Sequence, residues 1–338
     1  MKFRLTDDDI PRIRERPGMY LSSTTIRGVY NLIFSLVEEI IWDSKTTNVS
    51  MEIHLDECDT FHIKCDFPHG ITEGFVYVIK ALSCDFDLQV GQDSFELKFR
   101  PDRNVFSYDK IEYYRLYARL KELAQLNSRV KFILSDHENK NVLQFPKGLE
   151  AMLMEGRMYE FVLNEEMLLN INFSKDDIDV SVSMIYAYGR DVCLGYVNNK
   201  RTHDGGTHVN GLYDGILHAF REYIKNNDIK VEFVKTHPLF FLIERIEEKE
   251  YVFEETPNIL RSDVAKELNF VISVELEHPQ YTSTVRRKIG SEEVYSAVKY
   301  GVAESLKTIL DSDPSFFYSS RVIEKSELRG IRTDTTLE

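Results

Sequence analysis

The feature that most constrains the fold is a change of hydrophobic period in the second half of the chain. Every second residue is apolar in DIDVSVSMIYAY (177–188), as in a strand with one buried face. A further strand is predicted at CLGYVNN (193–199) and a helix at VNGLYDGILHAFREYIKN (209–226). The alternation returns in LNFVISVELE (268–277), and an amphipathic helix follows at 292–310. This order predicts a small α/β unit with its helices on one side of a sheet.

The first half of the chain shows the same two periods. One apolar helical face runs through NLIFSLVEEIIW (31–42), and another through KIEYYRLYARLKELAQL (110–126). Two short alternating runs, MEIHL (51–55) and FHIKCDF (61–67), are typical of paired strands. These patterns predict a first layered α/β unit.

The domain organisation follows from these runs and from one acidic stretch. We expect a first domain at 1–160, a second at 161–325 and a flexible tail at 326–338. The acidic stretch IERIEEKEYVFEETP (243–257) separates a helix from a strand of the second domain. A run of like charges is usually solvated, so we interpret the region near 240–257 as an insertion.

Composition narrows the class of protein. The 338-residue chain has 42 basic and 56 acidic residues, a net charge of −14, which argues against extensive sequence-independent contact with DNA. The sequence contains no apolar run of membrane-spanning length, and its N-terminus lacks the apolar core of a signal peptide. The four cysteines are scattered without a CxxC pair. These features predict a cytoplasmic protein that does not enter a membrane.

A turn with two histidines precedes the helix at 209–226. In RTHDGGTH, the residues His203, Asp204 and His208 surround a Gly-Gly pair, so the turn holds a metal, holds a phosphate, or only starts the helix. A metal site needs a third and fourth ligand at suitable spacing, and none is visible. The pattern therefore favours a turn in which glycine supplies backbone freedom.

Several segments in the same order resemble the ATPase half of the DNA gyrase B subunit and its topoisomerase IV relative. The resemblance implies an α+β fold, a GHKL-type ATPase-like α/β sandwich followed by a transducer domain with a ribosomal-protein-S5-like fold. It also implies that the DGGTH turn connects a strand to a helix in the transducer domain. The matching segments are RERPGMY (14–20), GVYNLIFSLVEEIIWD (28–43), LYARLKELAQLNSRVKFIL (116–134), DGGTHVNGLYDGI (204–216) and the stretch 263–298.

The resemblance places two nucleotide-site positions on the first long helix. The general base of the family aligns with Ser35, and the magnesium-binding Asn aligns with Glu39. A serine hydroxyl cannot accept a proton near neutral pH, so base catalysis worth roughly 10²–10⁴-fold is lost. Glu39 keeps a hard oxygen ligand for magnesium if magnesium-ATP binds. Glu38 is a remote candidate for a displaced base, and both glutamates equally fit the polar face of an ordinary helix.

The adenine motif of the family, DxGxG, reads DFPHG here. Asp66 and Gly70 remain as candidate nucleotide-binding residues, while Pro68 replaces a glycine and removes a backbone N–H. The Thr that closes the family's pocket aligns with Phe95. Both changes predict weaker recognition of adenine.

The phosphate-binding lid of the family is deleted. After the adenine motif, where the family has a glycine-rich loop, this chain has only the short segment ITEGFVYVIKALS (71–83). Such a loop binds phosphates through backbone N–H groups at a helix N-terminus. Losing three charge-assisted hydrogen bonds at about 2 kcal/mol each removes roughly 6 kcal/mol, or about 10⁴-fold in affinity.

Near the end of the matching region, the family's QTK motif aligns with Thr284, Val285 and Arg286. Arg286 thus keeps a cation where the γ-phosphate is sensed, or else 286–288 forms a basic patch for an acidic partner. We expect the N-terminal arm to be too short to cross to a second subunit. We also expect neither the metal-binding toprim domain nor the tail that grips a partner subunit in this chain.

The principal hypothesis is therefore a gyrase-B-like pseudo-ATPase, a scaffold or binding module without productive ATP turnover and without cofactor. Its expected partner is a protein, either a topoisomerase subunit or a second copy of the chain. The alternative is the ATP-hydrolysing subunit of a split type II DNA topoisomerase that uses magnesium and ATP, with the cleavage domain on another chain. A third hypothesis retains binding of a nucleotide or another small molecule without hydrolysis, through Asp66, Gly70 and Arg286.

Overall fold

The computed structural model describes most of the chain as two compact units. The described residues are 6–44, 47–67, 73–156, 168–187, 191–235, 251–284 and 286–325. The units are Met1–Met152 and Leu153–Glu338, which places the division slightly before the expected domain boundary at residue 160. Gly70 and the predicted tail at 326–338 lie outside the described residues.

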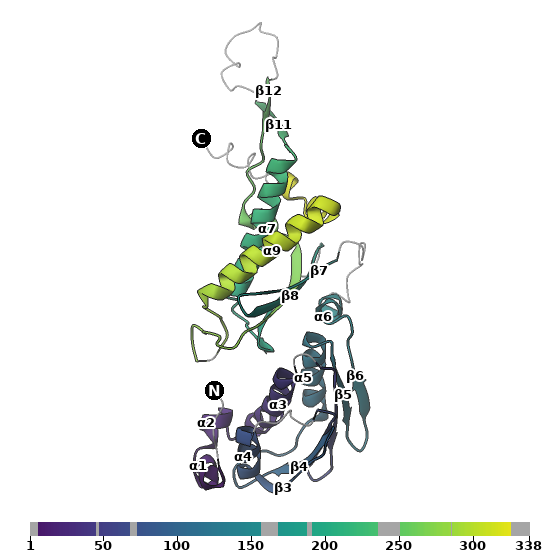
Figure 1. Cartoon of the computed structure of the whole chain (residues 1–338), viewed down its shortest axis with the longest axis vertical. Helices are drawn as coiled ribbons and strands as arrows, with labels where there is room; N and C mark the ends of the chain where they lie inside the picture. The colour runs from purple at the N-terminus through teal and green to yellow at the C-terminus, as the bar shows by residue number, and fades with distance from the viewer. Residues whose placement is uncertain are drawn as a thin grey trace. The chain divides into compact units, whose positions relative to one another are not determined.

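Unit 1 contains one six-stranded sheet with helices on one face (Figure 1). Its elements are η1 (Asp7–Asp9), α1 (Ile10–Glu15), α2 (Pro17–Leu21), α3 (Ile26–Asp43), β1 (Val49–Leu55), β2 (Phe61–Cys65), α4 (Glu73–Ala81), β3 (Ser83–Val90), β4 (Phe95–Pro101), α5 (Tyr113–Leu126), β5 (Val130–Ser135), β6 (Lys140–Leu143) and α6 (Leu149–Gly156), which crosses the division. The strand order is β3-β4-β2-β1-β5-β6, and every pair is antiparallel except the parallel pair β1–β5.

The core of unit 1 lies between this sheet and its helices. Burial alternates strictly along β2, where Phe61, Ile63 and Cys65 are buried and His62 and Lys64 are exposed. The buried set joins the apolar face of α3 in one cluster. The sheet therefore has an inner face covered by helices and an open face that is polar, as expected for a sheet covered on one side.

The RERPGMY segment acts as a clamp at one end of unit 1. The guanidinium of Arg14 donates to the carbonyl oxygen of Ala81 at 2.7 Å and to Oδ2 of Asp102 at 2.5 Å. Burial alone raises the pKa of Asp102, but the hydrogen bonds from Arg14 and from the Asn104 N–H outweigh it and leave that pKa lowered. Arg14 thus ties α1 to the end of α4 and to the residue after β4.

Unit 2 contains a five-stranded sheet covered on one face by two long helices (Figure 1). Its elements are β7 (Leu169–Lys175), β8 (Ile178–Tyr186), β9 (Cys193–Val197), β10 (Lys200–Arg201), α7 (Thr207–Asn226), β11 (Val231–Lys235), β12 (Tyr251–Glu255), α8 (Arg261–Ala265), β13 (Leu268–Glu275), α9 (Glu292–Ser312) and α10 (Ser315–Ser319). The order is β10-β9-β13-β8-β7, with β13 parallel to β9 and antiparallel to β8. The chain crosses from β9 to β13 through α7, which confirms the predicted order of strands and helices.

Helices α7 and α9 pack with their backbones unusually close. A Cβ atom added at Gly211 would lie 2.8 Å from the carbonyl oxygen of Tyr295, and one at Gly215 would lie 2.7 Å from that of Lys299. Real Cβ atoms do not approach oxygen this closely, so glycine is required at both positions of α7.

The acidic stretch differs in part from its prediction as a solvated insertion. Its residues 251–255 form β12, which pairs antiparallel with β11, while residues 236–250 lie outside the described part of the chain. The sequence did not reveal this strand because YVFEE has three apolar residues followed by two glutamates, without the alternation that predicts a strand. Among the helices that the structure describes, none is long and apolar enough to cross a membrane.

Candidate functional site

The first group of candidate residues lies on α3. Thr25 caps this helix by accepting a hydrogen bond from the Arg27 N–H at 3.4 Å, and the apolar side of α3 is buried against the sheet. Ser35, Glu38 and Glu39 are all half-buried on the same helix. The structure therefore brings these three predicted positions together within one turn of each other.

Glu38 is committed to an ion pair. Its Oε1 accepts from Nη2 of Arg119 on α5 at 2.7 Å, and the two side chains are only 17 % and 18 % exposed. Arg119 also pairs with Glu122. Burial lowers the pKa of Arg119, but the charges of Glu122 and Glu38 outweigh it and leave the pKa raised. The pair holds α3 against α5. This is a structural contact and not the environment of a general base with an unpaired carboxylate.

Asp66, the predicted adenine ligand, is exposed at the end of β2. Its Oδ1 accepts the backbone N–H of Ser50 at 2.7 Å, which ties β2 to the start of β1. Side chains alternate along a strand, so Asp66 points to the open face while Cys65 points to the helices. Asp66 and the α3 candidates therefore lie on opposite sides of the sheet.

The inner face beside Asp66 is packed with apolar side chains. Cys65 is directly paired with Phe95 across β2 and β4, and their exposed fractions are 0 % and 1 %. Burial raises the pKa of the Cys65 thiol to about 12, so the thiol stays protonated and acts as a small apolar group. Phe67 packs against the same core. This space is occupied by the protein itself.

The segment at the position expected for the glycine-rich lid is short and regular. Helix α4 ends at Ala81, and β3 begins at Ser83 after a single residue. The Leu82 N–H donates to the carbonyl oxygen of Val78 at 3.1 Å, so the helix runs directly into the strand. Between 73 and 90 the only glycine is Gly74, within α4.

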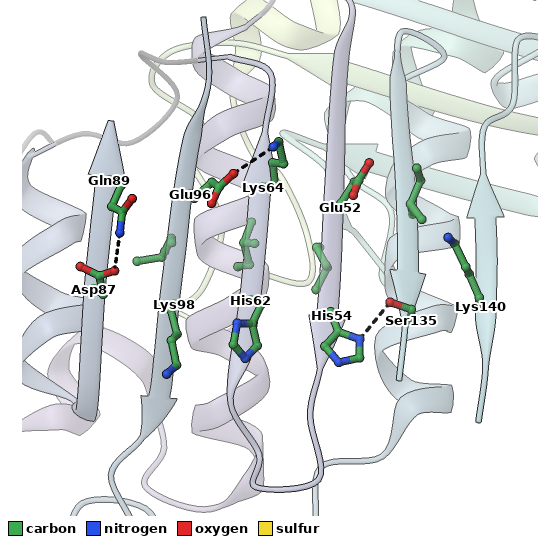
Figure 2. Close-up of a pocket in the computed structure, with 14 residues that line it drawn as sticks. Glu52, His54, His62, Lys64, Asp87, Gln89, Glu96, Lys98, Ser135 and Lys140 are labelled. Atoms are coloured by element: carbon green, nitrogen blue, oxygen red, sulfur yellow. Dashed lines mark hydrogen bonds and ion pairs between the residues drawn. The ribbon is translucent and has the colours of Figure 1, made fainter. Parts of the chain in front are cut away.

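A shallow hollow of about 380 Å³ lies on the open face of the unit 1 sheet. Its polar side chains come from all six strands of the sheet, and Figure 2 shows them on one face, with helices behind the sheet. Lys64 Nζ lies 2.9 Å from Glu96 Oε1, Gln89 donates to Asp87 at 3.0 Å, and His54 Nδ1 lies 3.1 Å from Ser135 Oγ. Its three lysines face three carboxylates, so the hollow has no net charge with which to attract phosphate.

Of the predicted nucleotide residues that the structure describes, Glu39, Asp66 and Arg286, none lines this hollow. Three pairs of its polar groups contact one another, as on the solvent-exposed face of a half-buried sheet. The hollow therefore does not unite the predicted candidates into one site.

In unit 2, the DGGTH turn positions its histidines for packing. His208 is fully buried, with Nε2 at 3.0 Å from the hydroxyl of Thr202, and burial lowers the pKa of His208 to about 4. The Thr202 hydroxyl donates to the Gly195 carbonyl oxygen at 2.9 Å, so His208 Nε2–H is the donor in their contact. The ring is therefore neutral, and among the residues that the structure describes none donates a hydrogen bond to its Nδ1.

The other polar residues of the turn point elsewhere. His203 is exposed, and Asp204 forms an ion pair with Arg287 at 2.9 Å. Across the described ranges no cluster of three or more His, Cys, Asp or Glu side chains is arranged to hold a metal ion. The turn interpretation thus fits the structure better than a metal site.

Arg286, the cation at the QTK position, is an exposed residue of unit 2. Its φ is +55°, and its guanidinium carbon lies 5.9 Å from the ring centroid of Tyr281. The other predicted residues, Ser35, Glu38 and Asp66 among them, belong to unit 1.

Reasoning from the sequence missed two features, the ion-pair partner of Glu38 and the direction of the Cys65 side chain. The partner of Glu38 is 81 residues away on α5, and no local pattern identifies Arg119 as that partner. The second, the inward direction of Cys65, was readable: alternation in FHIKC puts Cys65 with Phe61 and Ile63, and hence Asp66 on the other face.

Comparison with known proteins identifies the relatives of this fold. Among solved structures, the 43K ATPase domain of Thermus thermophilus gyrase B, crystallised with an aminocoumarin, matches with a TM-score of 0.74 at 19 % identity, over 96 % of this chain and 98 % of that one. The topoisomerase IV ATP-binding domain of Francisella tularensis, crystallised with a small-molecule inhibitor, matches with a TM-score of 0.70 at 20 % identity, over 96 % and 98 %. These matches confirm the predicted α+β fold of an ATPase-like domain followed by a transducer domain.

Sequence comparison agrees. The DNA gyrase B protein of Clostridium acetobutylicum is 22 % identical over 94 % of this chain and 57 % of its own, and the DNA topoisomerase 4 B protein of Bacillus subtilis is 24 % identical over 95 % and 56 %. The chain spans about half the length of these curated relatives. A family model described as DNA gyrase B matches residues 130–238 and 231–329, together more than half of the chain. On this evidence the chain belongs to the DNA gyrase B family.

Proposed function

We propose that this chain is a pseudo-ATPase of the gyrase B family, a scaffold that binds a protein partner and modulates DNA topology through a topoisomerase rather than by its own ATP turnover. The observation that carries the proposal is the packed inner face beside Asp66, where Cys65 and Phe95 fill the space next to the adenine position. Interiors packed at this density do not admit a ligand without displacing side chains.

Two further observations support the proposal. Ser35 stands at the base position and Glu38 is held by Arg119, so neither residue can activate water. Helix α4 leads directly into β3, at the position where the family has a loop whose backbone N–H groups bind phosphate. On this proposal the protein needs neither magnesium nor ATP and acts in the cytoplasm.

The test is a magnesium-dependent phosphate-release assay on the wild type and on Ser35→Glu, with a gyrase B ATPase domain as positive control. We expect no turnover from either protein, because restoring the base does not restore the phosphate contacts. Calorimetry with ATP, ADP and adenosine should show no heat of binding. Turnover by the wild type would refute the proposal, while heat without turnover would support a protein that binds nucleotide without hydrolysis.

The partner is tested separately. We expect affinity purification of the tagged chain from its native cell to recover a topoisomerase subunit, identified by mass spectrometry. If light scattering instead finds a stable dimer of the chain and no topoisomerase is recovered, the self-dimer replaces the topoisomerase as the partner.

One alternative keeps its own support. Glu39 retains a carboxylate at the magnesium position and Arg286 a cation at the γ-phosphate position, as the ATP-hydrolysing subunit of a split type II topoisomerase requires. That protein should dimerise with a nonhydrolysable ATP analogue. An unchanged mass by light scattering, with and without the analogue, would exclude this alternative.

A further inference from the structure

Basic side chains gather at one end of the unit 2 sheet. Strand β10 carries Lys200 and Arg201, and the loop between β13 and α9 carries Arg286, Arg287 and Lys288. We call these five residues the basic corner.

Hydrogen bonds of the backbone and of the Asn198 side chain hold the two segments of the basic corner together. The Asp204 N–H donates to the carbonyl oxygen of Arg287 at 3.0 Å, and the Leu276 N–H donates to Oδ1 of Asn198 at 2.9 Å. The Thr282 N–H donates to the carbonyl oxygen of Lys288 at 3.0 Å, which closes the loop on itself. The corner is therefore a built part of the fold and not a chance gathering of long side chains.

The positive charge of the corner is mostly uncompensated. Arg287 pairs with Asp204, but Arg201, Arg286 and Lys288 form no ion pair with any carboxylate in the part of the chain that the structure describes. All three are exposed. In a chain with a net charge of −14, three neighbouring cations without acidic partners stand out from the rest of the surface.

A pocket of about 460 Å³ opens within the corner. Lys200 and Arg286 line it, together with the carboxylate of Glu277 and the polar side chains of Asn198, His278 and Gln280. Arg286 adopts a φ of +55°, a conformation that costs about 1 kcal/mol for a residue other than glycine and is often found where a side chain is presented to a ligand. A planar guanidinium beside an ammonium suits the two oxygens of a carboxylate.

We propose that the basic corner docks an acidic segment of the protein partner, with aspartate or glutamate carboxylates bound by Arg286, Lys200 and their neighbours. An acidic peptide is favoured over nucleic acid because the corner is compact and the chain outside it is strongly acidic. A long phosphate backbone would extend beyond the corner and be repelled, whereas a short segment stays within the screening length of roughly 8–10 Å. The proposal rests on the binding-module function but not on the loss of ATP turnover.

The experiment measures fluorescence anisotropy of a labelled polyglutamate peptide with the full chain, against a polyglutamine peptide of equal length. We expect binding of polyglutamate only, weakening as salt is added. Reversing three charges, Arg201→Glu with Arg286→Glu and Lys288→Glu, should weaken binding by at least about tenfold. The neutral variant with glutamine at the same positions should lose less.

A matched control reverses three lysines near the other end of α7, Lys225→Glu with Lys230→Glu and Lys307→Glu. Helix α7 has 20 residues and is therefore about 30 Å long, so the control makes the same change in net charge far from the corner. We expect the control to reduce binding much less than the corner variant. Circular dichroism of each variant confirms that it is folded.

Three outcomes would overturn the proposal: no preference for polyglutamate over polyglutamine, equal loss in the corner and control variants, or tighter binding of single-stranded DNA of the same charge. The last would assign the corner to nucleic acid. The calorimetry with ATP is independent of these results, because heat from ATP would contradict the proposed pseudo-ATPase and leave the peptide result standing.

Discussion

The inner face of unit 1 and the turn that begins α7 in unit 2 both lie where the gyrase B resemblance places functional motifs, yet they use their side chains differently. In unit 1, the positions beside the predicted adenine motif belong to the core, as Cys65 and Phe95 show. In unit 2, Gly206 and His208 of the signature are both held by close packing. The family model likewise matches residues 130–329, and so chiefly unit 2.

This contrast indicates at which positions a side chain can change without loss of the fold. A side chain that meets only a ligand can be replaced by one that packs, and the fold gains an apolar contact. A residue whose backbone touches its neighbour cannot be replaced in this way, because any added atom collides. If this account is correct, substitutions in the unit 2 turn should be costly, and those at the polar α3 positions should cost less.

The largest effect is expected at the turn itself. Gly206 has a φ of +138°, and a Cβ there would lie 2.7 Å from the Ile289 nitrogen and still closer to the Ile289 oxygen, so Gly206→Ala should cost more than about 4 kcal/mol or prevent folding. Gly205 is the matched control: its φ is +65° but its nearest neighbours are 3.9 Å away, so Gly205→Ala should cost only about 1 kcal/mol. Urea unfolding measures both, and equal costs would contradict the view that the close contact of Gly206 with Ile289 makes glycine necessary there.

The next effect is a dependence on pH that arises from His208. The folded pKa of about 4 lies below the ordinary histidine value of 6.5, so the unfolded state binds the proton first as the pH falls. Stability is unaffected above pH 6.5 and decreases between pH 6.5 and 4, by about 3 kcal/mol in total.

Urea unfolding at several pH values measures this dependence. We expect His208→Gln to be less stable at pH 7 but to lose less on acidification, whereas His203→Gln, changed at the exposed histidine, should follow the wild type. The same acid sensitivity in wild type and His208→Gln would show that the His208 ring is not neutral and buried.

A smaller effect is expected on α3. Glu38→Gln removes one partner of half-buried Arg119 but leaves Glu122, so it should cost about 2 kcal/mol. The control is Glu96→Gln in the exposed pair with Lys64, for which no change is expected. Chemical unfolding compares the two variants. No loss in Glu38→Gln would indicate that Glu38 is available for another role.

The smallest effect concerns the clamp made by Arg14. Because the pKa of Asp102 is lowered in the folded state, the carboxylate contributes stability above the unfolded pKa, and this contribution is lost as the pH falls below it. Arg14→Gln should reduce stability at pH 7 by less than about 1 kcal/mol and make Asp102→Asn nearly neutral in the double variant. Additive losses in the double-mutant cycle would contradict a direct pair.

Much of the fold was readable from periodicity, because long amphipathic runs leave few alternatives. The helices at 31–42 and 209–226 were predicted and are confirmed within α3 and α7, and so is the pairing of β1 with β2. The order of strands in each sheet and the clamp at Arg14 were not predictable, since both depend on contacts between residues far apart in sequence.

The candidate site was less predictable for a physical reason. Alignment to a motif assigns a residue type to a position but not the face of the sheet on which it lies, and Asp66 shows the difference. The neutral state of His208 likewise follows from burial that a sequence does not display. The residues whose roles depend most on packing were therefore the hardest to predict from the sequence.

The glycine contacts between α7 and α9 have a mechanical consequence. Two helices that touch through their main chains have no soft layer of side chains between them, so they resist sliding and rotation and behave as a single stiff lever. Helix α9 begins next to the loop that carries Arg286. It has 21 residues and ends at Ser312, about 30 Å from its start. A displacement of the loop would thus be transmitted almost completely to the far end of the two helices.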